Sequence, residues 1–177
     1  MPVTSDSAPT SRKKAAAPKI SAGIMLFRQR LKSLEIFLGH PGGPFFAKKD
    51  LGSWTIPKGG LAPSESPEDG ARREFLEEVG FSPTDEESLI DLGQVKQRSG
   101  KTVRCFACKF GQEDEWIESK FHSQPFTMEW PPKSGRTAEF PELDQARFFP
   151  VDLARKKILP SQAEFIERLI SELAKNS

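Results

Sequence analysis

The sequence predicts an α+β domain in which helices cover a mixed sheet, and three observations lead to this prediction. Short apolar or alternating segments, typical of strands, occur on both sides of one central segment with helical spacing. That central segment carries a capping signal at its start and a glycine at its end. An amphipathic segment with helical spacing then closes the chain.

Three strands are expected before the central helix. Residues 19–28 (KISAGIMLFR) form the first strand, and residues 34–39 (LEIFLG) form its partner after a turn. Residues 40–53 are rich in Gly and Pro, so they are expected to form a loop. The short apolar run at residues 54–57 is expected to be a strand that ends in a Lys-Gly-Gly turn at 58–60.

The central helix is expected between Ser66 and Gly80. Ser66 suits the N-cap position, Pro67 suits the first turn, and Asp69 stands at the third position of a capping box. Gly80 is the residue expected just after the last turn. Gly70 disfavours the helix by about 1 kcal/mol relative to Ala. Phe75 and Val79 lie opposite the acidic face, with Leu76 beside them, so this side of the helix can pack on a core.

The second half of the chain adds strands and a closing helix. The expected elements are a hairpin of residues 89–98 and 102–110, a strand at 116–121, a segment at 126–130 that leads into a loop at 131–136, a strand at 146–151 and a short helix at 152–158. The closing helix is expected at residues 161–174, with Ser161 and Glu164 as a capping box. Its apolar positions recur with helical spacing and should pack on the sheet.

Composition limits the location and partners of the protein. Residues 1–18 are rich in Pro, Ala, Ser, Thr and Lys and are expected to be a disordered tail, which leaves residues 19–177 as one folded domain. The chain shows neither a secretory signal nor an apolar run of about 20 residues, so we expect a cytoplasmic protein with no membrane partner. A net charge of +1 argues against nucleic-acid binding by bulk electrostatics.

Cys105 and Cys108 form a C-x-x-C motif within a segment that alternates like a strand. Positions three apart on a strand face opposite sides, so the two sulfurs should diverge. We therefore interpret these residues as two small core or near-surface side chains rather than as a redox or metal site.

Three carboxylates mark one face of the central helix. Glu74, Glu77 and Glu78 stand at i, i+3 and i+4 and therefore share a face. A hard cation such as Mg²⁺ or Mn²⁺ would offset their mutual repulsion, hold phosphate oxygens and activate a water. An exposed acidic helix face is the alternative reading. The glycine-rich segment at residues 58–60 favours the site, because it can bring carbonyl groups and a lysine up to that face.

Residues 59–81 resemble the Nudix box, G-x5-E-x7-R-E-U-x-E-E-x-G-U with U apolar. The match has no gap and no substitution, and it consists of Gly59, Glu65, Arg73, Glu74, Phe75, Glu77, Glu78, Gly80 and Phe81. The resemblance extends over roughly residues 19–175. It implies an α/β/α sandwich with the box helix on one side of the sheet and the C-terminal helix on the other. It also implies metal-dependent hydrolysis of a pyrophosphate bond in a nucleoside diphosphate linked to another group.

The resemblance also implies individual roles. The expected Mg²⁺ or Mn²⁺ ligands are the backbone carbonyl of Gly59 and the carboxylates of Glu74, Glu77 and Glu78. Glu65 is expected to make a water-mediated contact or to anchor the structure, and Arg73 to orient Glu77. The general base is expected to be Glu77 or a later carboxylate. Glu139, which precedes the last strand together with Glu142, is the candidate outside the box.

Substrate contacts are expected from basic and aromatic residues. Lys58 lies in a Pro-Lys-Gly-Gly sequence that is common in the dinucleoside polyphosphate and inositol pyrophosphate branches of the family, and it could bind an extra phosphate. Lys133 and Arg136 could clamp the far end of a polyphosphate, and Trp130 could stack on a base. Two subclass markers are absent, namely a tyrosine after the box and the proline of many ADP-ribose hydrolases.

The leading hypothesis is therefore hydrolysis of a (di)nucleoside polyphosphate. Nucleoside triphosphates and nucleotide sugars are alternative substrates, and a non-catalytic nucleotide sensor is an alternative function that the intact carboxylate set disfavours. A 5′-end RNA pyrophosphohydrolase is disfavoured by the near-neutral charge and the lack of an evident basic-aromatic stripe. The expected partner is a small nucleotide rather than a nucleic acid. The oligomeric state stays open, a homodimer included.

Overall fold

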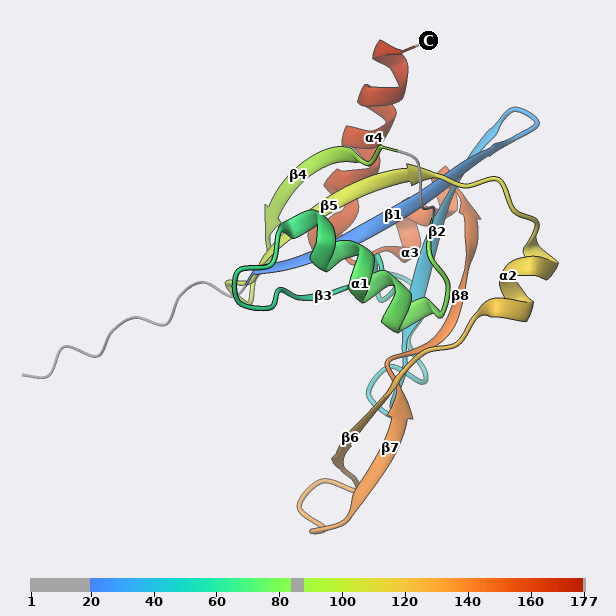
Figure 1. The fold of residues 1–177 in the computed structure, drawn as a ribbon. Helices are drawn as coiled ribbons and strands as arrows, with labels where there is room; N and C mark the ends of the chain where they lie inside the picture. Colours follow the sequence, from blue (N-terminus) through green and yellow to red (C-terminus); the bar gives the residue numbers. More distant parts are fainter. Residues whose placement is uncertain (1–19, 84–87, 177) are drawn as a thin grey trace, which may run out of the picture.

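The protein is described by a computed structural model that covers residues 20–83 and 88–176. A twisted mixed sheet carries helices on both faces, and a two-stranded hairpin projects beyond it (Figure 1). The predicted α+β class is therefore confirmed. The tail predicted at residues 1–18 lies outside the described residues. No helix in the described part of the chain is long and apolar enough to cross a membrane.

The main sheet has six strands, and β1 lies at its centre. The order is β4-β5-β1-β2-β8, and β3 also pairs with β1. The strands are β1 (Ile20–Arg30), β2 (Ser33–Pro41), β3 (Lys58–Gly60), β4 (Ile90–Lys96), β5 (Thr102–Lys109) and β8 (Leu143–Pro150). The β1–β5 pair is parallel and the others are antiparallel, so the sheet is mixed.

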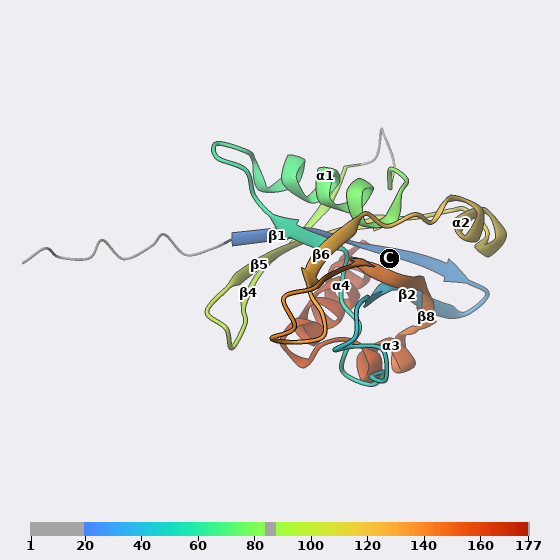
Figure 2. The same ribbon diagram turned by 90° about the horizontal axis from the view of Figure 1, so that it is seen from below.

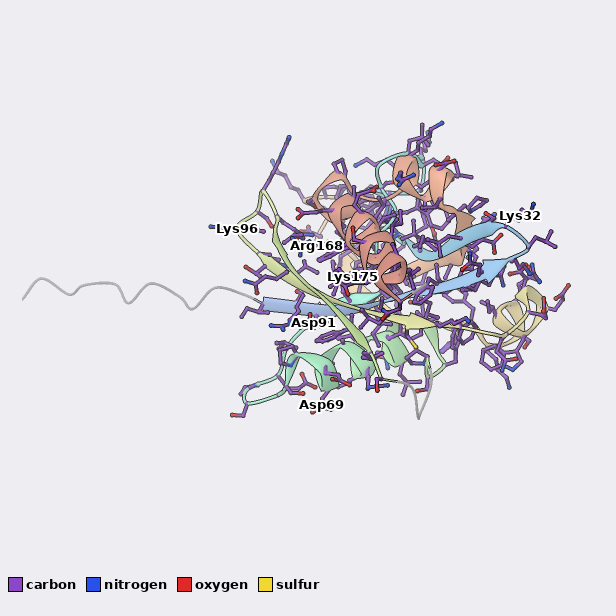
Figure 3. All side chains as sticks on the ribbon, turned by 90° about the horizontal axis from the view of Figure 1, so that it is seen from above. Lys32, Asp69, Asp91, Lys96, Arg168 and Lys175 are labelled. Atoms are coloured by element: carbon purple, nitrogen blue, oxygen red, sulfur yellow. The ribbon has the colours of Figure 1, made fainter. Side chains whose placement is uncertain are left out.

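Helices form a layer on each face of the sheet. Helix α1 (Pro67–Val79) covers one face, and α3 (Val151–Lys157) and α4 (Ala163–Lys175) cover the other (Figure 2). Figure 3 shows Asp69 of α1 and Arg168 of α4 on opposite sides of the sheet. Arg168 Nη1 donates to the carbonyl of Leu92 at 2.8 Å, which fastens α4 to β4. The α/β/α arrangement agrees with the layers that the family resemblance implies.

Each layer buries its own apolar core. Phe75 and Val79 of α1 are buried on one face of the sheet, and Phe165 and Leu169 of α4 are buried on the other. Burying a side chain of this size contributes about 1.5–3 kcal/mol. Cys105 lies in the core under α4, whereas Cys108 lies in the core under α1. The prediction that the two sulfurs diverge is therefore confirmed, and both residues are buried.

The ends of α1 follow the sequence signals. Ser66 Oγ accepts a hydrogen bond from the Asp69 amide at 3.1 Å, and Gly80 ends the helix with a φ of 89°. Gly70, which lowers helix propensity, has a packing role. A Cβ there would overlap the Leu61 side chain and would lie 3.0 Å from Glu65 Oε2. The glycine therefore lets the preceding loop pack closely on α1.

Two elements around the sheet differ from the prediction. Residues 116–121 were predicted as a strand, but α2 (Asp114–Lys120) is a helix. Ile117 and Phe121 lie four residues apart, and this spacing gives a helix one apolar side. The strand predicted at 54–57 instead lies at 58–60 as β3, where Gly59 pairs with Ala22 of β1. Trp54 and Thr55 form only isolated bridges.

The segment after α2 also differs. Residues 125–129 and 137–141 pair as a hairpin, β6 (Pro125–Glu129) and β7 (Thr137–Pro141), whereas β7 was not predicted. Strand β8 begins at Leu143 rather than at residue 146. The capping box at Ser161 is wrong, because α4 begins at Ala163 after the 3-10 turn Pro160–Gln162. The buried side chain of Gln162 instead accepts from the Ile56 amide at 3.0 Å.

Candidate active site

Helix α1 packs against β1 and β3, so its acidic face lies beside the glycines of β3. The closest approach is between Gly59 and Glu74. A Cβ on Gly59 would lie only 2.6 Å from Glu74 Oε1, and closer still to Oε2 and Cδ. Real Cβ atoms essentially never come this close to another heavy atom. Glycine at this position therefore lets a carboxylate reach the backbone of β3.

Arg73 connects the box carboxylates. Its Nε and Nη2 atoms donate to the two oxygens of Glu65 at 2.8 and 2.9 Å, and its Nη1 donates to Glu74 at 2.8 Å and to Glu77 at 3.2 Å. Nη2 also reaches the Gly60 carbonyl at 3.0 Å. Hydrogen bonds from Arg73 lower the pKa of Glu65 to about 2. Arg73 and Glu65 thus anchor the acidic face, and Glu65 shows the contacts of a structural anchor.

Glu78 and Lys58 form the inner part of the face. The Lys58 amide donates to Glu78 Oε2 at 2.9 Å. Burial raises the pKa of Glu78 to about 8, and this hydrogen bond opposes the rise only in part. Burial also lowers the pKa of the Lys58 ammonium group, and the attraction of Glu78 opposes that change. A carboxylate whose desolvation is only partly compensated is the type of group that a bound cation stabilises.

The acid that joins this face from outside the box is Glu142, not Glu139. Glu142 lies in the connection between β7 and β8, and burial raises its pKa, with the charges of Glu74 and Glu77 adding to the rise. Glu139 is exposed on β7, opposite Thr127 of β6. The sequence places both acids just before the last strand. The bend after Pro141, which the missed hairpin creates, decides which of them reaches the face.

The donor set suits a hard divalent cation. The acidic face offers only carboxylate and carbonyl oxygens, which Mg²⁺ and Mn²⁺ prefer. Among the described residues, however, no three His, Cys, Asp or Glu side chains are already gathered as a metal site. Glu74 and Glu77 bind Arg73, and Glu78 binds the Lys58 amide. Hydrogen bonds with Arg73 and with the Lys58 amide therefore occupy an oxygen of each of these three carboxylates.

Two surface hollows have similar volumes, and one of them borders this region at Gly60 and Glu65. One, of about 490 Å³, is lined by Ile20, Ser21, Gly60, Leu61, Ala62, Glu65 and Lys101. The other, of about 510 Å³, lies between α2 and β8. Neither is lined by Glu74, Glu77 or Glu78. Lys101, which we did not select from the sequence, precedes β5, and its charge acts on Lys58. The parallel β1–β5 pair brings it there, since Thr102 is paired with Ile20.

The three predicted substrate contacts in the second half of the chain lie apart from the carboxylates. Trp130, Lys133 and Arg136 lie at or beside the tip of the β6–β7 hairpin. Five residues of strand span roughly 17 Å, so the tip is about that far from the base of the hairpin at Glu142. The structure therefore does not gather these three residues around the acidic face.

Comparison with known proteins agrees with this fold. The profile of the NUDIX domain family matches residues 17–169. The RNA pyrophosphohydrolase of Rhodospirillum rubrum is 28% identical over 167 residues, which cover 89% of this chain and 93% of the relative. The RNA pyrophosphohydrolase of a Wolbachia strain from Drosophila simulans is 32% identical over 123 residues, or 61% of this chain and 69% of the relative.

Solved structures share the fold at low sequence identity. The Ap4A hydrolase of C. elegans, in a binary complex, aligns with a TM-score of 0.59 and 19% identity over 88% of this chain and 98% of its own. The NUDIX domain of Shewanella oneidensis NrtR, in complex with ADP ribose, aligns with a TM-score of 0.61 and 16% identity over 95% of this chain and 94% of its own.

The fold and the acidic face define a hydrolase that acts on pyrophosphate bonds. The chain belongs to the NUDIX domain family. Members of this family generally need divalent metal ions for activity. The predicted resemblance, fold and enzyme class are therefore confirmed.

Proposed function

We propose that the protein hydrolyses a phosphoanhydride bond in a nucleoside 5′-polyphosphate, with Mg²⁺ or Mn²⁺ as cofactor. The observation that carries this proposal is the acidic face, in which Glu74 reaches the backbone of Gly59 and the half-buried Glu78 accepts a hydrogen bond from the Lys58 amide. Water attack on a phosphorus atom needs alignment and charge neutralisation more than covalent help. An oxygen-only donor set beside the half-buried Lys58 suits that task.

Each residue has a part in this proposal. Glu74, Glu77, Glu78 and the Gly59 carbonyl would hold the cation, which supplies charge neutralisation and an activated water when it is bound. Arg73 positions Glu74 and Glu77 through its hydrogen bonds, so it is a positioning residue. The general base is Glu77 or a carboxylate outside the box. Glu142 replaces Glu139 as the candidate outside the box.

Lysines favour a substrate with several phosphates. Lys58 and Lys101 lie close enough for their charges to act on each other, at the end of the acidic face near Glu65. Two ammonium groups beside an acidic face match a chain of three or more phosphates better than the diphosphate of a nucleotide sugar. A dinucleoside polyphosphate is therefore our first candidate substrate. Nucleoside triphosphates are a shorter form of the same chemistry.

A 5′-triphosphate end of RNA is the second candidate substrate. It presents the same polyphosphate on a 5′ carbon, and two relatives at 28% and 32% identity are named RNA pyrophosphohydrolases. These names weigh against our sequence-based preference for a small nucleotide. The net charge of +1 describes the whole chain and does not exclude local basic regions.

A substrate panel tests the proposal. Diadenosine tetraphosphate, a nucleoside triphosphate, a nucleotide sugar, ADP-ribose and a 5′-triphosphate RNA are incubated with Mg²⁺ or Mn²⁺, and the products are separated and identified. We expect turnover of one or more polyphosphates and slower turnover of the sugar compounds. Nucleotide binding by calorimetry without product at any metal concentration would support a sensor and refute the proposed function.

Paired variants identify the outside carboxylate. If Glu142 is the base, Glu142→Gln should lower kcat by about 10²–10⁴-fold. The matched variant Glu139→Gln should keep kcat near the wild-type value, because its side chain is exposed on the hairpin. If both variants keep full activity, neither Glu142 nor Glu139 is the base.

A further inference from the structure

The β6–β7 hairpin has one apolar side, and the loop of residues 42–49 lies along it. Side chains alternate along both strands, so Phe126 and Phe140 face one side while Glu129 and Glu139 face the other. At the base of the hairpin, a Cβ on Gly43 would lie 3.3 Å from the Phe126 ring. Further along, the rings of Phe45 and Trp130 meet edge to face, with centroids 5.7 Å apart.

This aromatic pair is accessible. Phe45 is 56% exposed, although large aromatic side chains are usually buried, and Trp130 is half-buried. Their contact therefore leaves ring surface open to solvent at the outer end of the hairpin. An exposed flat ring beside a second ring is a suitable platform for another flat group.

The same region concentrates positive charge. Residues 41–49 and 130–138 together contain four cationic residues and no acid, although the whole chain has a net charge of only +1. The four residues are Lys48, Lys49, Lys133 and Arg136, and all of them are exposed. Open rings in two segments that also carry exposed cations are suited to stacked bases and backbone phosphates. An acidic or neutral protein surface would match the charges but would leave the rings without flat partners.

The region is continuous with the acidic face. The Gln124 amide donates to the Glu77 carbonyl at 3.2 Å, the Glu142 amide donates to the Gln124 carbonyl at 2.9 Å, and the Gly42 amide donates to the Glu142 carbonyl at 2.9 Å. The end of α1, the base of the hairpin and the start of the 42–49 loop are thus joined by successive hydrogen bonds. The aromatic pair lies roughly 17 Å farther out along the strands.

We propose that Phe45, Trp130, Lys48, Lys49, Lys133 and Arg136 form a hairpin face that binds single-stranded RNA. The 5′ polyphosphate lies at the acidic face, and the nucleotides that follow it run along the hairpin, where the two rings stack on bases and the cations contact phosphates. This proposal rests on the RNA-end form of the proposed function. Trp130, Lys133 and Arg136 lie too far from the carboxylates to hold a short polyphosphate. In this proposal they contact the nucleotides that follow the 5′ end instead.

A binding assay with an unreactive RNA tests the hairpin face separately from hydrolysis. The probe is a single-stranded RNA of about 12 nucleotides, with a 5′-hydroxyl end and a dye at the 3′ end, and its anisotropy is measured with the full chain at about 50 mM salt. Phe45→Ala and Phe45→Leu should each weaken binding roughly tenfold, whereas Phe45→Trp should keep the affinity within about twofold. The leucine variant separates stacking from general apolar contact.

Two further measurements sharpen the test. Leu31→Ala removes a fully exposed apolar side chain from the β1–β2 turn and should leave RNA binding unchanged. Lys133→Gln and Arg136→Gln should each reduce the slope of log K against log salt by about 0.7, the value for one phosphate contact on a single strand. Circular dichroism checks that each variant keeps its fold.

Several results would overturn the hairpin face. The proposal fails if the wild-type protein does not bind the 5′-hydroxyl RNA. It also fails if Phe45→Ala binds this RNA with an affinity within about twofold of the wild type. A Phe45→Ala variant that turns a dimer into a monomer with unchanged RNA affinity would assign the surface to a second copy of the chain. RNA binding that depends on Phe45, in a protein that releases nothing from 5′-triphosphate RNA, supports the hairpin face and refutes the RNA-end reaction instead.

Discussion

Replacing Gly59 with alanine tests how the acidic face is built. The new Cβ would lie 2.6 Å from Glu74 Oε1 and closer to the rest of the carboxylate. An ordinary contact is about 3.5 Å, so the carboxylate has to retreat by at least about 1 Å. It then leaves Arg73, which now donates to it at 2.8 Å. Because the displaced group can rotate, stability should fall by no more than about 1 kcal/mol.

Activity should suffer far more than stability. A misplacement of about 1 Å in a catalytic arrangement costs on the order of 100-fold in rate. We therefore expect Gly59→Ala to lower kcat on the best substrate of the panel by about that factor, at saturating Mg²⁺. Gly60→Ala is the matched control, because a Cβ at residue 60 meets nothing within 4 Å. This variant should keep kcat within about threefold of the wild-type value. Equal losses in both variants, or near-normal kcat in Gly59→Ala, would refute this reasoning.

Three further predictions follow from the same face. Glu78→Gln should abolish hydrolysis of the best substrate of the panel while circular dichroism shows an intact fold, and retained turnover would remove Glu78 from the site. Lys58→Ala should raise KM more for longer polyphosphates than for shorter ones, and equal effects on all substrates would contradict its proposed phosphate contact. The affinity for Mn²⁺, measured by calorimetry, should rise by up to about tenfold per pH unit between roughly pH 5 and 8 and then level off, because bound metal must displace the Glu78 proton.

The sign of the pH effect follows from the raised pKa of Glu78. Between its ordinary value of 4.5 and its value of about 8 in the fold, the native protein holds a proton that the unfolded chain has lost. This group therefore makes the metal-free protein less stable as the pH rises through that window. The affinity for the metal ion rises in the same pH window, because fewer Glu78 side chains hold a proton that the metal must displace. A pH-independent affinity, or the same slope in Glu78→Gln, would show that another group controls metal binding.

Local signals in the sequence predicted the box helix well. Ser66, Asp69 and Gly80 act within one helix, and capping needs only neighbouring residues, so both ends of α1 follow from the sequence. The spacing of Glu74, Glu77 and Glu78 likewise fixed a common face before any tertiary structure was known. The family motif then supplied the expected chemistry, which helical spacing alone could not.

Tertiary contacts decided what the sequence did not reveal. The Ser161 capping signal failed because the neighbouring Gln162 side chain is used to satisfy the backbone of Ile56 in the core. Glu142 rather than Glu139 joins the acidic face because a hairpin precedes β8, and its second strand follows a loop rich in Pro and Gly. Lys101 is distant in sequence from the box and reaches it through a parallel strand pair, which no local pattern encodes.

The placement of Cys105 and Cys108 gives the protein two internal reporters. Their thiols lie three residues apart on β5 but under different helical layers, one beneath α4 and the other beneath α1. A thiol reagent can reach each sulfur only when the layer above it opens. Mass spectrometry on single-cysteine variants would give the labelling rate of each thiol. The two rates would therefore measure separately how often each helical layer opens locally.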